Sequence, residues 1–166
     1  MPIQNAQLAR VVAREIAAVK AEVLGYPDDA SLWTELPGLP NSGGTLALHL
    51  AGNLRHFIGR GMGGSEYVRD RDAEFKTRGM SRADVAALID AAATEVAAAF
   101  ATAPADFVDL APPMQMPNGA KIQMPVGVLH LMAHLAYHLG QLDYHRRSVT
   151  GQVAGVGAMD IMKLAD

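Results

Sequence analysis

The segment HLMAHLAYHLGQLDYH, residues 130–145, sets His130, His134 and His138 four residues apart and His145 two helical turns further on. An α-helix turns by about 100° per residue, so these four imidazoles fall on one face of a helix. Imidazole is the commonest metal ligand among side chains, and two histidines one turn apart can bind one divalent ion. The segment therefore predicts a long helix with a metal site on one face.

An earlier segment offers a third ligand. LHLAGNLRHF, residues 48–57, places His49, Asn53 and His56 on one face of a second predicted helix. If the two helices pack side by side, His49 completes a three-histidine set with His134 and His138, and coordination positions stay open to water or substrate. The alternative is that these histidines are boundary residues, hydrogen-bonded to backbone or water.

The other three histidines are expected to lie outside the ligand set. Three consecutive turns of one helix span about 12 Å, so His130 is predicted to line the pocket rather than bind the ion. His56 lies two turns from His49 and is predicted to stand beside the ion for the same reason. His145 comes near the end of its helix, where a structural role is the better interpretation.

Several polar residues share or border the histidine faces. Asn53, Tyr137 and Gln141 could orient water or substrate, and the alternative is that they are buried polar groups satisfied within the fold. Arg55 and Arg60 could guide an anionic substrate, although Arg55 points away from the histidine face. The sequence identifies no catalytic residue beyond these candidates.

Composition indicates an all-α protein. Half of the 166 residues are hydrophobic, alanine is frequent among them, and aromatic residues make up only 5 %, which favours helices packed through small side chains. The length is that of a single domain, residues 1–166. The formal charge of −3, without a basic stripe, argues against nucleic acid as a partner.

The absence of cysteine excludes disulfides, thiolate nucleophiles and cysteine-ligated metals, so any ion must be bound by nitrogen or oxygen. The N-terminal segment is amphipathic and lacks the pattern of a secretory signal. The chain also has no run of about 18 uninterrupted apolar residues. We therefore expect a cytoplasmic protein without a membrane partner.

Hydrophobic periodicity and end signals predict four helices, over residues 5–24, 45–60, 81–103 and 125–150. Residues 27–44 are predicted to form a loop, which Trp33 and Leu36 hold against the core. The glycine cluster at residues 59–64 ends a helix and does not follow a strand, so it is not a phosphate-binding loop.

Two connections remain. The charged residues 61–80 lack periodicity and predict a surface crossover. Asn118-Gly119, between two short segments in residues 114–124, predicts a β-hairpin just before the last helix, with Pro117 keeping its strand at an edge. A short helix is expected near the C-terminus.

The histidine segments also resemble a known family. His134 and His138, followed by Gly140 and Gln141, match the HxxxHxGQ signature of the DinB-like (DinB/YfiT) metalloenzyme superfamily, and LALHLAGNLRHFIG is similar to its helix-two motif, with His49 as the third ligand. The resemblance covers most of the chain and looks closest to a branch with HLAGNLRH followed by RDRDAEF. It implies a four-helix bundle with an up-down-down-up course and a three-histidine divalent site. It also implies a thiol-dependent S-transferase or isomerase that uses mycothiol or bacillithiol.

From both lines of reasoning we expect Zn or Ni bound by His49, His134 and His138. A low-molecular-weight thiol would be the cosubstrate and a small electrophile the substrate. An external thiol is a sensible nucleophile because the ion lowers the pKa of a bound thiol and the protein has no cysteine of its own. We also expect a homodimer.

Three alternatives stay open at this point. A metal-dependent hydrolase would need a carboxylate as general base near the ion, and none is predicted there because Asp143 lies on the opposite side of its helix. A non-catalytic metal-binding stress or storage protein would enclose its ion fully. A plain structural bundle would use its histidines only for hydrogen bonds.

Overall fold

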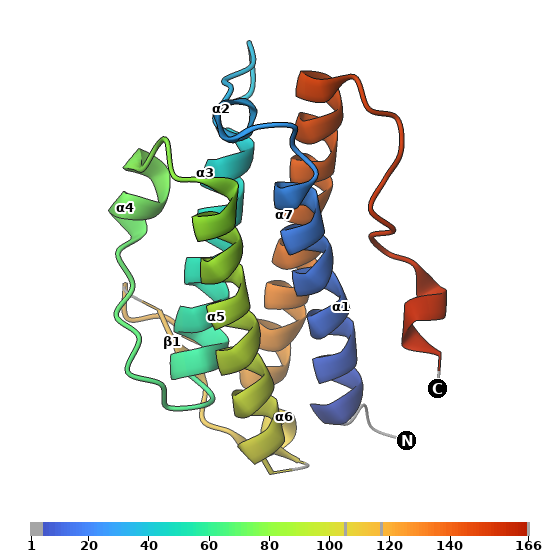
Figure 1. Cartoon of the computed structure of the whole chain (residues 1–166). Helices are drawn as coiled ribbons and strands as arrows, with labels where there is room; N and C mark the ends of the chain where they lie inside the picture. The colour runs from blue at the N-terminus through green and yellow to red at the C-terminus, as the bar shows by residue number, and fades with distance from the viewer. Residues whose placement is uncertain (1–4, 105, 117, 166) are drawn as a thin grey trace.

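The computed structural model describes residues 5–104, 106–116 and 118–165, and four long helices dominate it (Figure 1). They are α1 (Asn5–Leu24), α3 (Gly43–Leu54), α5 (Arg82–Thr102) and α7 (Met124–Thr150). In Figure 1, α1 and α7 run upwards while α3 and α5 run downwards. Helices α1 and α3 each contact both α5 and α7, so the four form a bundle. The predicted all-α class is confirmed.

Short elements connect or follow these helices. They are α2 (Asp29–Leu32), the π-helical turn η1 (Arg55–Arg60), α4 (Arg71–Lys76), α6 (Phe107–Leu110), β1 (Met114–Gln115), β2 (Lys121–Ile122) and the 3-10 helix η2 (Ile161–Leu164). The two strands pair antiparallel, with Met114 opposite Ile122. Gly119 supplies the positive φ of +83° that the turn requires. The predicted hairpin is confirmed, whereas Pro117 lies outside the described residues.

The core forms where the apolar stripes of the four helices meet. The α7 stripe consists of buried residues at helical spacing, Val128, Leu131, Leu135, Leu139 and Leu142. Each histidine of the 130–138 row precedes one of these leucines by one position and is therefore rotated by about 100° from the core. The histidines consequently face the border of the core, where α7 meets α3.

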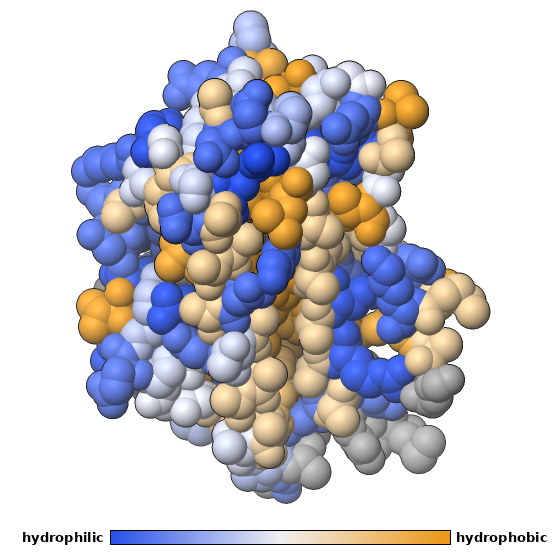
Figure 2. All heavy atoms as spheres, viewed as in Figure 1, coloured by the Kyte–Doolittle hydropathy of each residue, from blue (hydrophilic) through white to orange (hydrophobic). Residues whose placement is uncertain are grey.

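Helix α5 is long and apolar enough to cross a membrane by length and composition, with 39 % of its most apolar window buried in the fold. It packs against α1, α3 and η1, as a bundle helix does. Between α1 and α5 the surface is hollowed into an apolar groove of about 650 Å³, lined largely by alanines (Figure 2). Lys20 and Asp90, with 2.7 Å between Nζ and Oδ2, form an ion pair at this groove.

The predicted loop at 27–44 contains an unpredicted helix. Asp28 caps α2 by accepting a hydrogen bond of 2.7 Å from the Ser31 backbone N–H. This turn buries Leu32 completely, while Leu36 stays partly exposed outside the core, so the prediction for Leu36 was wrong. Trp33 does hold the segment against the bundle, because its Nε1 donates a hydrogen bond of 2.8 Å to the Met80 carbonyl.

The predicted crossover at 61–80 also contains a helix, α4, which corrects the expectation of an irregular segment. Asp70 caps α4 by accepting a hydrogen bond of 2.9 Å from the Ala73 N–H. Glu74 on α4 is only 5 % exposed. The sequence of residues 61–80 shows no helical period because α4 buries the carboxylate of Glu74 rather than a stripe of apolar side chains.

The second predicted helix begins at Gly43 rather than Thr45, with Ser42 as its N-cap, and changes its geometry near the end. Residues Arg55–Arg60 form a π-helical turn, in which the Gly61 N–H donates to the His56 carbonyl over 3.0 Å. A π turn rotates successive side chains by less than an α turn does. His56 therefore does not keep the face that α-helical spacing predicts for it.

Candidate metal centre

Three histidines from two helices meet beside the core. The ring centroid of His49 on α3 lies 5.1 Å from those of His134 and His138 on α7, which are 4.5 Å from each other. The Nε2 atoms of His49 and His134 are 3.1 Å apart. Each ring offers a nitrogen, and all three nitrogens lie within 4.8 Å of one another.

This geometry fits a shared divalent ion. Two nitrogens that each bind one ion at about 2.0 to 2.1 Å lie about 2.8 to 3.4 Å apart, the lower end for neighbouring octahedral positions and the upper end for tetrahedral ones. The 3.1 Å between His49 and His134 falls in that range. Nδ1 of His134 is buried and has no hydrogen-bond partner within the described residues.

Hydrogen bonds fix the tautomers of two of the rings. Nδ1 of His49 lies 2.9 Å from the Glu74 carboxylate, and Nδ1 of His138 lies 2.7 Å from the Gln141 amide oxygen. Both partners are acceptors, so each Nδ1 carries the proton and each Nε2 keeps its lone pair. Rings oriented in this way present Nε2 as the metal-binding atom.

Glu74 is in turn held by an arginine. Nε and Nη2 of Arg69 donate to the two carboxylate oxygens over 2.6 Å and 2.8 Å, a bidentate pair. Burial acts to raise the pKa of Glu74, but the hydrogen bonds from Arg69 and His49 outweigh it and lower the pKa. Glu74 therefore stays ionised and accepts a hydrogen bond from the protonated Nδ1 of His49.

A glycine makes room for this carboxylate. A Cβ atom added at Gly52, one turn after His49 on α3, would lie 2.1 Å from Oε1 of Glu74. No real side chain fits at that distance, so a glycine at this position lets α4 approach α3 closely. The position of the Glu74 carboxylate beside His49 therefore depends on the missing side chain of Gly52 on α3.

The environment also keeps His134 and His138 neutral. Burial, followed by the nearby rings of His138, His49 and His130 and by Arg69, lowers the pKa of His134 to about 4. Burial likewise lowers the pKa of His138. A neutral imidazole is the form that binds metal. Both rings are already neutral at neutral pH, so an ion does not have to displace a proton from them.

The three rings line a cavity of about 700 Å³. Its wall is mostly apolar and includes Phe57 and Phe75 together with Met114, Met116 and Ile122 from the hairpin segment. Gly127 permits the hairpin to close against α7, because a Cβ there would meet Sδ of Met114 at 2.4 Å. No carboxylate lines the cavity among the described residues.

Of the predicted polar candidates, two reach this cavity. Asn53, 7 % exposed, and His130, with its ring 6.0 Å from that of His134, both line it. Gln141 contacts His138 from outside the cavity. Tyr137 is 65 % exposed and packs edge-on against the His138 ring at 5.1 Å without lining the cavity.

His56 lies in a neighbouring cavity of about 390 Å³, which shares Phe57 and Met114 with the cavity of the three histidines. Burial, with the charges of Arg69 and Arg60, lowers the pKa of His56. Its Nδ1 is buried and has no hydrogen-bond partner within the described residues. The π-helical turn thus places His56 beside the centre rather than in it.

The two arginines predicted to guide an anion are engaged elsewhere. Arg55 donates two hydrogen bonds, of 2.6 and 2.9 Å, to Glu95 and lies over the Tyr67 ring at 4.0 Å. Arg60 donates to the Tyr67 carbonyl over 3.1 Å. Neither lines the cavity of the three histidines, so the prediction for these two residues was wrong. Arg69 and Arg71 line it instead.

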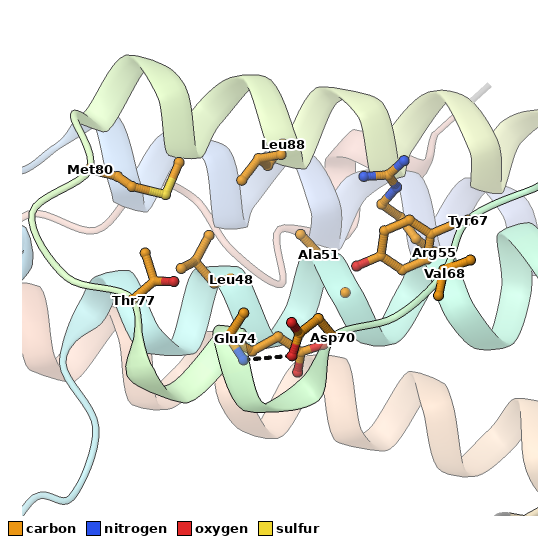
Figure 3. Close-up of a pocket in the computed structure, with 12 residues that line it drawn as sticks. Leu48, Ala51, Arg55, Tyr67, Val68, Asp70, Glu74, Thr77, Met80 and Leu88 are labelled. Atoms are coloured by element: carbon orange, nitrogen blue, oxygen red, sulfur yellow. Dashed lines mark hydrogen bonds between the residues drawn. The ribbon is translucent and has the colours of Figure 1, made fainter.

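A third, smaller cavity of about 200 Å³ borders Glu74, between α3, α4 and α5 (Figure 3). Its lining includes Leu48, Leu88, Tyr67 and Arg55 as well as Glu74 itself. The Glu74 side chain thus borders this cavity while it contacts His49.

His145 has the structural role predicted for it. It is 1 % exposed, its Nδ1 lies 2.7 Å from the Tyr26 hydroxyl, and its Nε2 lies 2.9 Å from the Thr34 carbonyl. Both ring nitrogens are therefore satisfied inside the bundle. Asp143 is paired with Arg147 at 2.8 Å and does not line the cavity.

Sequence reasoning missed the residues that support the ligands. The prediction that no carboxylate stands near the site was wrong, since Glu74 contacts His49 directly. The signal was present in RDRDAEF, where Asp70 is a good N-cap and acidic residues fill the next turn, as at a helix start. Arg69 carries no such signal, because its role appears only when α4 folds back on α3.

The chain also matches the model of a known protein family. The family model described as Mycothiol-S-transferase matches residues 7–151, a range that includes all three histidines and the HxxxHxGQ segment. Curated proteins and solved structures give no match. The match spans most of the chain and confirms the predicted resemblance. The chain belongs to the mycothiol S-transferase family, within the DinB/YfiT-like metalloenzyme superfamily.

Proposed function

We propose that the protein is a metal-dependent S-transferase that joins a low-molecular-weight thiol to a small electrophile. The observation that carries this proposal is the set of His49, His134 and His138, with their nitrogens converging at the wall of a large open cavity. When bound, a divalent ion, Zn or Ni, would lower the pKa of a thiol and so supply a thiolate at neutral pH. The family makes mycothiol the first thiol to test.

The chain's own residues orient the ligands and shape the cavity. Glu74 and Gln141 keep Nε2 of their histidines free of protons. Phe57 and the hairpin residues Met114 and Ile122 surround the site with apolar surface, which excludes water from the electrophile. Asn53 is placed to donate a hydrogen bond to a bound substrate.

A metal-dependent hydrolase is less well supported. Hydrolysis would use a general base within hydrogen-bond reach of a bound water. Glu74 is the only carboxylate found beside the three histidines within the described residues, and Arg69 and His49 already occupy both of its oxygens. It lines no part of the main cavity. A storage protein is also less well supported, because the three rings are open to this cavity rather than enclosed.

The test is a conjugation assay with protein made without an affinity tag. The metal-loaded protein is expected to accelerate the reaction of mycothiol with iodoacetamide or with an activated alkene. Removal of the ion with a chelator should abolish the acceleration and leave the helical circular dichroism signal intact, since the apolar core does not depend on the ion. A protein that hydrolyses esters but ignores the thiol would favour the hydrolase instead.

The cytoplasmic location, the single domain over residues 1–166 and the homodimer are part of this proposal. The surface that best supports a homodimer is the apolar groove between α1 and α5 (Figure 2). Sedimentation equilibrium of the purified protein tests the dimer directly. A monomer at all concentrations would remove it from the account.

A further inference from the structure

One cation at the metal cavity has no ionic or hydrogen-bond partner among the described residues. Arg71, the first residue of α4, lines this cavity and is exposed, and it forms no hydrogen bond or salt bridge within the described part of the chain. The other arginine of the lining, Arg69, is bound to both oxygens of Glu74. The neighbouring acid Asp72 has Lys76 as its partner, with 2.7 Å between Oδ2 and Nζ.

The position of Arg71 is fixed by an aromatic contact. Its guanidinium carbon lies 4.8 Å from the centroid of the Phe75 ring, one helical turn further along α4. The same ring lies 5.0 Å from the ring of His49. One phenyl ring thus contacts both the Arg71 guanidinium and His49, and all three residues line the same cavity.

The cavity between these two points selects for a particular shape and charge. Its wall is mostly apolar, and no carboxylate lines it within the described residues, so nothing there neutralises Arg71. A planar guanidinium pairs best with a carboxylate or phosphate group, to which it can donate two parallel hydrogen bonds. An apolar chain with one anionic end matches both the wall and the cation.

We propose that Arg71 binds the carboxylate of the electrophilic substrate, so that the enzyme prefers electrophiles in which a short apolar chain joins a carboxylate to the reacting carbon. This inference rests on the proposed function. In the reaction the thiolate sulfur attacks the carbon that bears the leaving group. A sulfur–carbon bond forms, the carbon–halogen bond breaks, the halide leaves with its electron pair, and the thiol proton passes to the buffer.

The test compares matched acids and amides with mycothiol as the thiol. The pairs are iodoacetate with iodoacetamide, and 6-iodohexanoate with 6-iodohexanamide. Each kcat/KM is divided by the uncatalysed rate constant of the same electrophile, and the acid-to-amide ratio is then taken. The ratio for the wild-type protein is expected to exceed one, and more so for the longer pair, whose chain fills more of the apolar cavity.

Arg71→Gln should lower this ratio roughly tenfold, the usual effect of losing a charged hydrogen bond, and Arg71→Lys should lower it less. Lys121→Gln is the control, because it removes the same charge from an exposed residue next to Ile122 that does not line the cavity. If the acid-to-amide ratio falls equally in both variants, the preference for acids reflects the overall electrostatic field of the protein. A specific contact with Arg71 is then ruled out. A ratio unchanged by Arg71→Gln would overturn the proposal.

A binding measurement on the metal-free protein separates this inference from the proposed function. Hexanoate should bind more tightly than hexanamide by calorimetry, and Arg71→Gln should abolish the difference. If iodoacetamide is not conjugated but hexanoate still binds through Arg71, the transferase proposal fails and the anion site stands. If conjugation proceeds but acids and amides bind alike, the anion site fails alone.

Discussion

The Glu74 carboxylate lies 2.9 Å from Nδ1 of His49 although 25 residues separate them in the chain. Helix α4 brings Glu74 there, and the missing side chain of Gly52 leaves space for it. The carboxylate fixes the tautomer of His49 and increases the basicity of its Nε2. The metal centre therefore depends on a segment that supplies none of its ligands.

Removing this support should weaken metal binding without unfolding the protein. Glu74→Ala is expected to lower the affinity for Zn by about 10- to 100-fold, because His49 loses its fixed tautomer and Arg69 its partner. Competition with a chromogenic chelator measures the affinity. Asp72→Ala, which removes an exposed acid from the same helix, should leave it unchanged. Equal affinities for wild type and Glu74→Ala would contradict the role given to Glu74.

A single methyl group at Gly52 should have a similar effect by a steric route. In Gly52→Ala the new Cβ would lie 2.1 Å from Oε1 of Glu74, so the carboxylate or the whole of α4 must move away. We expect lower Zn affinity and lower thermal stability. Gly140→Ala on α7 is the control, since its Cβ would meet nothing within 4 Å. Alanine should raise helix stability there by up to about 1 kcal/mol.

The sequence predicted the four long helices well because their apolar residues recur with helical period, as in the α7 stripe from Val128 to Leu142. Helical spacing also placed His134 and His138 on one face of their helix. That His49 meets them depended on the two helices packing side by side, which the family resemblance implied. The sequence did not predict α4, where the buried residue is Glu74 and no apolar stripe exists. Hydrophobic spacing also does not reveal the π turn at Arg55–Arg60, which contains His56.

The histidine ligands could be predicted from the sequence, whereas the residues that hold them in place could not. Ligand spacing is local and can be read along one helix, as for His134 and His138. The partners of those ligands come from distant segments, so Arg69 and Arg71 could be identified only once α4 was placed against α3. Arg55 was a wrong candidate for the same reason, because its partner Glu95 is 40 residues away.

A buried ion pair outside the metal centre should contribute strongly to the free energy of unfolding. Arg146 on α7 is 1 % exposed and donates a hydrogen bond to Glu22 on α1, which is fully buried. Glu22→Ala leaves the buried guanidinium with only the more distant Asp143 carboxylate, 3.5 Å from Nη2, and is expected to cost about 3 kcal/mol. Urea denaturation measures this loss. Lys20→Ala, which breaks a half-exposed pair with Asp90, should cost less than about 1 kcal/mol.

The metal-free protein should lose stability in mild acid. The pKa of His134 is about 4 in the folded state, below its ordinary value of 6.5, so the unfolded chain binds an extra proton between these values. The stabilisation is complete above pH 6.5 and is lost as the pH falls towards 4. Since the ring is half-buried, we expect a loss of about 1 kcal/mol between pH 7 and pH 5.

Urea titrations at several pH values, with chelator present, measure this dependence. His134→Gln should flatten it, because glutamine does not titrate. The lowered pKa values of His138 and His145, both caused mainly by burial, act in the same direction, so part of the slope should persist in the variant. A stability that rises as the pH falls from 7 to 5 would contradict the assignment of neutral, buried imidazoles.

The central claim is that His49, His134 and His138 together bind one divalent ion. Native mass spectrometry of untagged protein titrated with Zn tests it most directly. We expect one ion per chain in the wild type and in His130→Ala, and no stoichiometric ion in His49→Ala, His134→Ala or His138→Ala. Retention of the ion in any of these three variants, or its loss in all four, would contradict the account.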